Sequence, residues 1–322
     1  MTYTSQGLIE ATDYNNFANN GTPNINGFWA TGSGASGWGQ TALSTVTANV
    51  TAVAATQWST LVNTLSAAGA HTGTTITSRV APVANTLISV LANVSTDITN
   101  INTNRRTAVA SGSQFFTYTG SQSKTGGTSG ATWTITFTTT VSWANVDAAR
   151  YFFNTGGRIK LETSKSSTGN TGDPEWNDLA TTLMSDLFFT AGAGTNIIAG
   201  TTYTGTTRSG GTGTPTTNAS TTGFLDLTPG GAATTVYQQA ADTAPYTGNF
   251  IRVSLSRNAA GNVLTITTLW NNADSDPISG GTADNGSGTP GTAPATLVSL
   301  FFPSITNLAN SWGSITINSS IT

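Results

Sequence analysis

The spacing of apolar side chains changes near residue 112 of this 322-residue chain. Before that point apolar residues recur at intervals of three and four, which is the spacing of one helical face. After it they alternate with polar residues, as in the run WTITFTTTVSW at 133–143, which is typical of a half-buried strand. The two spacings suit different elements, so we expect an α+β fold. A helical region at 1–112 would precede a mainly antiparallel β-sandwich or jelly-roll-like domain at 113–322.

Two helices are expected in the first region, at 41–68 and at 82–108. Their polar positions hold Ser, Thr and Asn, which are weak helix formers, so both helices depend on burial of their apolar faces. The second helix has apolar residues at four, three, four, three spacing, as in a heptad repeat. This spacing suits either a helical hairpin within one chain or a short coiled coil between subunits. The predicted assembly seam consists of Leu87, Leu91, Val94, Ile98 and Ile101.

The second region contains about nine short runs rich in β-branched and aromatic residues, separated by loops of Gly, Ser and Thr. Such runs at short intervals are typical of an antiparallel sandwich. One inserted helix is expected at 173–189, with Asp173 as its cap and Pro174 in its first turn. A hairpin is expected around 258–262, between two alternating runs.

The run ARYFFNTGGRIKLETS at 149–164 concentrates aromatic and basic residues in a chain of which only 8% is charged. We interpret it as a helical or extended segment, a tight turn at NTGG and a strand, with the aromatic side chains in the core. Its basic residues, Arg150, Arg158 and Lys160, are expected to pair with the acidic residues between 173 and 186. A basic and aromatic patch for a glycan or an anionic partner is the alternative.

The composition argues against several kinds of chemistry. There is no cysteine, and His71 is the only histidine, so neither a thiolate site nor a histidine pair is available. We expect His71 to lie at a helix C-terminus. The acidic residues of 173–186 are interpreted as the first turn and solvent face of a helix. We therefore predict no catalytic residue, no metal site and no cofactor.

Charge and hydropathy predict that neither nucleic acid nor a membrane is a partner of this chain. The sequence pI is about 4.9, and the eleven Lys and Arg residues are scattered, which does not suit a nucleic-acid binder. No apolar run approaches the roughly 20 residues of a membrane helix. The N-terminal residues lack the features of a signal peptide.

Two patterns carry a resemblance to a known family. The first is LIEATDYNNF followed by GFWATGSGASGWGQ, and the second is RYFFNTGG followed by a helix with PEWNDL. Together they resemble virion structural proteins of tailed bacteriophages, including phages of cyanobacteria. The matching positions include Asp13, Tyr14, Asn15, Trp29, Trp38, Gly39, Gln40, Arg150, Tyr151, Phe152, Phe153, Asn154, Gly156, Gly157 and Trp176.

The resemblance implies a structural, non-enzymatic component of the tail, neck or fibres, made in the host cytoplasm and located in the virion. Its partners would be further copies of itself, in a homotrimer or another symmetric oligomer, and other virion proteins. A capsid decoration or cement protein is one alternative. A receptor-binding protein that recognises host surface glycans is another.

Overall fold

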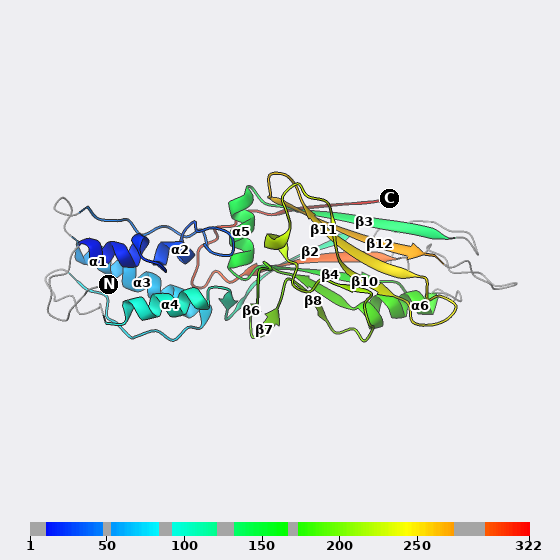
Figure 1. Cartoon of the computed structure of the whole chain (residues 1–322), viewed down its shortest axis with the longest axis horizontal. Coiled ribbons are helices and arrows are strands. Elements are labelled where there is room, and N and C mark those ends of the chain that lie inside the picture. The colour runs from blue at the N-terminus through cyan, green and yellow to red at the C-terminus, as the bar shows by residue number, and fades with distance from the viewer. Residues whose placement is uncertain (1–10, 48–52, 84–91, 121–131, 167–172, 274–293) are drawn as a thin grey trace.

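The fold was analysed in a computed structural model, which describes residues 11–47, 53–83, 92–120, 132–166, 173–273 and 294–322. The molecule is elongated, with the helical part at one end and a two-sheet β-sandwich extending toward the other (Figure 1). This arrangement confirms the expected α+β fold with an N-terminal helical region and a β-rich domain.

The helical part is built on long-range packing of short helices. Apolar side chains from all its helices form one core, in which Trp58 and Leu61 are fully buried. Tyr14 and Phe17 pack edge-on against the Trp58 ring, at centroid distances of 5.4 and 6.3 Å. The elements are α1 (Ala11–Asn15), the π-helix η1 (Asn16–Asn20), α2 (Ile25–Trp29), α3 (Ala55–Thr72) and α4 (Val94–Thr103).

Both expected long helices are shorter in the structure. Residues 41–47 are not helical, because the side chains of Asn15 and Asn26 hydrogen-bond the backbone there. The side-chain amide of Asn26 accepts a hydrogen bond from the Leu43 N–H and donates one to the Leu43 carbonyl. The side-chain amide of Asn15 binds Val46 in the same way. Helix α3 begins only at Ala55, where the Gln57 side chain accepts a hydrogen bond from the Ala54 backbone. The second helix is described only as α4, and residues 84–91 lie outside the described ranges.

Two antiparallel sheets face each other across the main core. One has the strand order β14-β3-β12-β11-β10-β9 and the other β2-β13-β4-β5-β8, while β1-β6-β7 form a small third sheet in which β1 and β6 are parallel. The strands are β1 (Thr107–Ala108), β2 (Ser111–Gly120), β3 (Trp133–Ser142), β4 (Arg158–Ser164), β5 (Asp186–Phe189), β6 (Asn196–Ile198), β7 (Thr201–Tyr203), β8 (Thr206–Ser209), β9 (Thr217–Asn218), β10 (Thr234–Ala240), β11 (Phe250–Arg257), β12 (Val263–Asn272), β13 (Ala295–Pro303) and β14 (Thr316–Ile321).

Alternation in the sequence predicts most of these strands correctly. In β3 and β12 every second side chain is buried, and the β11–β12 hairpin turns at 258–262 as expected. The run FLDLT at 224–228 also alternates between apolar and polar residues from Leu225 onward, but it contains the 3-10 helix η3 (Phe224–Asp226) instead of a strand. There the carboxylate of Asp226 accepts hydrogen bonds from the backbone of Gly223 and Ala193, which holds the turn closed.

The inserted helix also ends earlier than expected. It consists of α6 (Asp173–Asn177) and the π-helix η2 (Asp178–Met184), and residues 186–189 form β5. Ser185 has φ +56° and ψ −148°, a conformation outside the helical regions, and it ends the helix. The run DLFF then alternates in burial as a strand, because Leu187 and Phe189 enter the core.

Candidate functional site

The two sequence patterns meet in one structure, which we call the joint and define as loop 31–40 together with helix α5 (Val146–Asn154). Helix α5 stands between the helical part and the sandwich (Figure 1). Arg150 Nη1 donates to the carbonyl oxygens of Thr31, at 2.6 Å, and Ser36, at 2.7 Å. Asn154 Nδ2 donates to Gly34 and Gly37, each at 3.2 Å. The joint therefore connects segments 119 residues apart through polar side chains and loop carbonyls.

Close packing across the joint explains two further pattern positions. Gly39 has φ +68°, and a Cβ atom added there would overlap the ring of Tyr151. Trp38 is fully buried beside it and donates its indole N–H to the Arg105 carbonyl at 3.2 Å. A larger residue at position 39 would separate the loop from α5.

A third segment, residues 308–311, also contacts the joint. The Gln40 side chain exchanges two hydrogen bonds with the backbone of Ala309, at 2.8 and 3.0 Å. Ser311 Oγ donates to the Trp38 carbonyl at 2.6 Å, and Leu308 is buried in the core of the helical part. The helical part therefore includes residues from the end of the chain, which a division at residue 112 does not anticipate.

The remaining pattern residues lie on either side of the joint. Phe152 and Phe153 are buried and contact Trp143, each at 5.5 Å, so the expected entry of these aromatics into the core is confirmed. Gly156 and Gly157 form the turn into β4, where a Cβ atom on Gly157 would lie 2.5 Å from the Phe152 carbonyl oxygen. Trp176 belongs to a different place, between Trp133 and Trp270 in the sandwich core. Asp13 is in α1, and the indole of Trp29 donates to the Thr41 carbonyl.

The predicted pairing of basic residues with the acids of 173–186 holds for one of three. Lys160 Nζ lies 2.8 Å from Asp186 Oδ2 and 3.0 Å from Glu162 Oε1. Arg150 pairs instead with Asp147, one helical turn away at 2.8 Å. Arg158 lies over the rings of Phe301, at 4.5 Å, and Tyr203, at 5.7 Å, so its alkyl and guanidinium groups are used in packing.

The three described members of the predicted seam are buried inside this chain. Val94, Ile98 and Ile101 are each at most 1% exposed and belong to the core of the helical part. Helices α3 and α4 pack on each other within one chain, as the intramolecular interpretation proposed. Leu87 and Leu91 lie outside the described residues.

His71 lies in the last turn of α3, as predicted, but its environment is apolar. It packs edge-on against Trp38 at a centroid distance of 5.1 Å and is 3% exposed. Its Nε2 atom has no hydrogen-bond partner among the described residues. Burial lowers the pKa of His71 from 6.5 to about 4, so the imidazole is neutral at pH 7.

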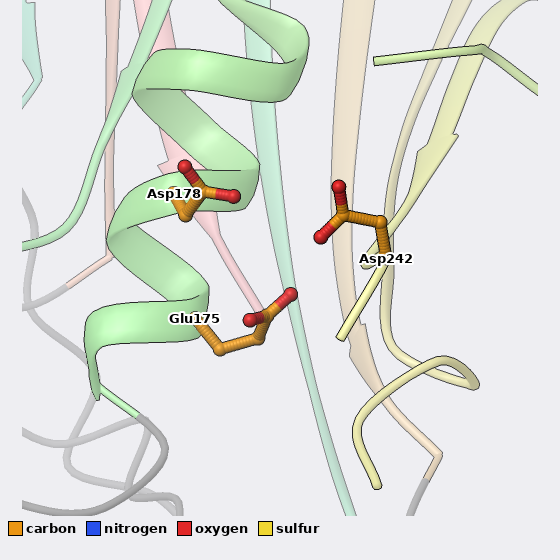
Figure 2. A group of neighbouring side chains, drawn as sticks. All are labelled: Glu175, Asp178 and Asp242. Carbon is orange, nitrogen blue, oxygen red and sulfur yellow. The ribbon is translucent and has the colours of Figure 1, made fainter. Parts of the chain in front are cut away.

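An acidic cluster, formed by Glu175, Asp178 and Asp242, lies on the sandwich (Figure 2). One oxygen from each carboxylate lies within 4.8 Å of the oxygens offered by the other two. Glu175 and Asp178 come from the inserted helix, and Asp242 follows β10. Sequence reasoning placed the first two on a solvent face and gave no signal for Asp242, because the loop that carries it is 64 residues further along.

Arg257 was also not singled out from the sequence, and unlike Asp242 it is buried. Its guanidinium donates to the carbonyls of Phe224, Leu227 and Gly261 and lies 4.1 Å from the Phe224 ring centroid. The alternation of β11 does indicate that Arg257 is buried, because it lies two residues after Leu255 and four after Val253, which both face inward.

Comparison of the chain with models of protein families, with curated proteins and with solved structures found no match. None of the helices within the described ranges has the length and apolar character required to cross a membrane.

Proposed function

We propose that this chain is a non-catalytic structural component of a tailed-bacteriophage virion, of the tail, neck or fibre type. The observation that supports this role is the joint. The residues that resemble the phage family are used in packing and in hydrogen bonds between distant segments, with Arg150, Asn154 and Gly39 at its centre. This arrangement lies where the helical part of the elongated molecule meets the sandwich (Figure 1).

Docking is proposed to occur at the helical end. Val80 and Val83 are 87% and 64% exposed there, and neighbouring exposed apolar residues can mark an interaction surface. Val83 and Pro82 border a shallow depression of about 510 Å³, whose other walls include Ala54 and Ala55. An apolar surface of this kind suits a second copy of the chain, in a homotrimer or another symmetric oligomer, or a neighbouring virion protein.

The proposed location is tested by quantitative mass spectrometry of purified particles of the phage that encodes the chain. Copies numbering in the tens per particle are expected for a tail, neck or fibre protein. Hundreds of copies would indicate a capsid decoration protein instead. Absence from purified particles would contradict a virion role altogether.

The proposed assembly surface is tested by multi-angle light scattering on the full chain. Deleting the helical region is unsuitable, because Leu308 and Ala309 belong to the same packed unit. The double variant Val80→Ser/Val83→Ser removes the apolar surface and leaves the core intact. We expect the wild-type chain to form an oligomer and the double variant to be monomeric. A double variant that remains fully oligomeric would exclude this surface.

A further inference from the structure

The acidic cluster gathers negative charge from two elements that are distant in the sequence. Glu175 lies in α6 and Asp178 in the first turn of η2, and Asp242 lies in the loop between β10 and β11. In Figure 2 the carboxylates of Glu175 and Asp242 point toward each other across the gap between the helix and the loop. No ion pair between described residues involves any of the three.

Glu175 is the member whose environment requires a partner. The residue is only 9% exposed, and its Oε1 atom is buried without a hydrogen-bond partner among the described residues. An unpaired buried carboxylate oxygen is costly, and like charges nearby add to that cost. Burial is the main cause that raises the pKa of Glu175, and Asp242 and Asp178 raise it further against hydrogen bonds from Thr243 that lower it.

We propose that Glu175, Asp178 and Asp242 bind a divalent cation of the calcium class. The three offered ligands are carboxylate oxygens, the donors that hard cations select. Calcium–oxygen distances of about 2.3–2.6 Å allow two ligands of one ion to lie up to roughly 5 Å apart. The observed span of at most 4.8 Å fits this range. Magnesium, at about 2.1 Å, would require the oxygens to move within roughly 4 Å of one another.

A bound cation would fasten the inserted helix to the edge of the sandwich. The helix is anchored on its other side, where Trp176 and Leu179 enter the sandwich core. Asp242 is exposed, so water can complete the coordination shell and the ion can enter from solvent. This inference does not depend on the proposed virion role.

The competing explanation is a proton in place of a metal ion. Protonation of Glu175 would also relieve the buried charge, and its raised pKa favours the protonated form. The two explanations predict different behaviour for the variant Glu175→Gln. Glu175→Gln mimics the protonated state and should stabilise the chain when no cation is present, but it removes a ligand.

The test uses the full chain, freed of divalent ions with a chelator, at pH 7 and constant ionic strength. Thermal unfolding and isothermal titration calorimetry are measured with CaCl2, with MgCl2 and with NaCl alone. We expect CaCl2 at about ten times Kd to raise Tm by about 2 °C, with a smaller effect of MgCl2. A chain that shows neither binding heat nor a Tm shift at 5 mM CaCl2, several times the weakest expected Kd of about 1 mM, would overturn the proposal.

Variants of the acidic cluster test whether the calcium ion binds there. Asp242→Asn and Glu175→Gln should each weaken calcium binding at least tenfold, and Glu175→Gln should raise Tm in the absence of calcium. The matched control is Glu162→Gln, which also removes one negative charge but at a carboxylate paired with Lys160. It should keep the calcium response. A response that survives in both cluster variants, or is equally strong with MgCl2, would contradict the assignment. Asp242→Asn keeps the test valid should Glu175→Gln not fold.

Discussion

Arg150 Nη1 donates to the backbone carbonyl of Thr31 at 2.6 Å, and this bond connects helix α5 to loop 31–40 at the joint. The same nitrogen serves Ser36, and the other terminal nitrogen serves Asp147. Such a fork of fixed donors is particular to arginine, because the lysine ammonium offers its protons from one atom. The joint thus depends on the shape of the side chain as well as on its charge.

Replacing Arg150 with Lys should therefore lower the free energy of unfolding by about 1–2 kcal/mol, since loop carbonyls lose their donors. Urea unfolding followed by tryptophan fluorescence measures this loss. Arg252→Lys is the control, because Arg252 is half-buried in β11 and lies over the Phe250 ring. Equal stability of Arg150→Lys and the wild-type chain would show that charge alone is sufficient.

Gly39→Ala should destabilise the chain by about 3 kcal/mol. The left-handed backbone at φ +68° costs about 1 kcal/mol for alanine, and overlap of the new methyl group with the Tyr151 ring adds the rest. Gly34→Ala separates the two causes, because φ is +54° there and nothing lies within 4 Å of the added Cβ. Its loss should stay near 1 kcal/mol. Similar losses for both variants in urea unfolding would contradict tight packing at Tyr151.

His71 should make stability fall in mildly acidic solution. Its pKa is about 4 in the folded chain and 6.5 when exposed, so the unfolded chain binds the proton first. The stability from neutral His71 is complete above pH 6.5 and is lost as the pH falls toward 4, by about 3 kcal/mol. Urea unfolding of the wild-type chain and of His71→Gln between pH 7 and 4 measures the difference. Parallel curves would mean that folding does not shift the pKa of His71.

Ile98→Ala should reduce stability by about 2–4 kcal/mol without altering the oligomeric state of the folded chain. The reason is that Ile98 fills the core of its own helical part. Thr99→Ala, at an exposed position of the same helix, is the control and should cost less than 1 kcal/mol. Light scattering and circular dichroism on the same samples decide the case. If the variant keeps its helices but its oligomer dissociates, Ile98 would instead belong to an interface between subunits.

The sequence predicts the β-domain better than the helical part, for a physical reason. Strand alternation is local, and it locates β3, β11 and β12 directly. The segment before Ala55 has helical spacing as well, but Asn15 and Asn26 bind its peptide groups from more than 15 residues away. A tertiary hydrogen bond of this kind leaves no periodic signal.

The candidate sites show the same limit. The aromatic and glycine residues of the joint could be singled out from the sequence, because they are dense in a chain of Thr, Ser and Gly. The partners of these residues could not be predicted, because Arg150 and Asn154 bind backbone carbonyl oxygens, which every residue has. Asp242 likewise approaches Glu175 only because β10 ends beside the inserted helix.

The return of residues 308–311 to the helical part sets the order of events during synthesis. The contacts of Trp38 with Ser311 and of Gln40 with Ala309 form only after 273 and 269 further residues, respectively, have been translated. The helical part thus begins to be translated before the sandwich strands but is completed only after most of them. A ribosome stalled before codon 308 would hold a nascent chain whose helical end lacks its final apolar contact, Leu308.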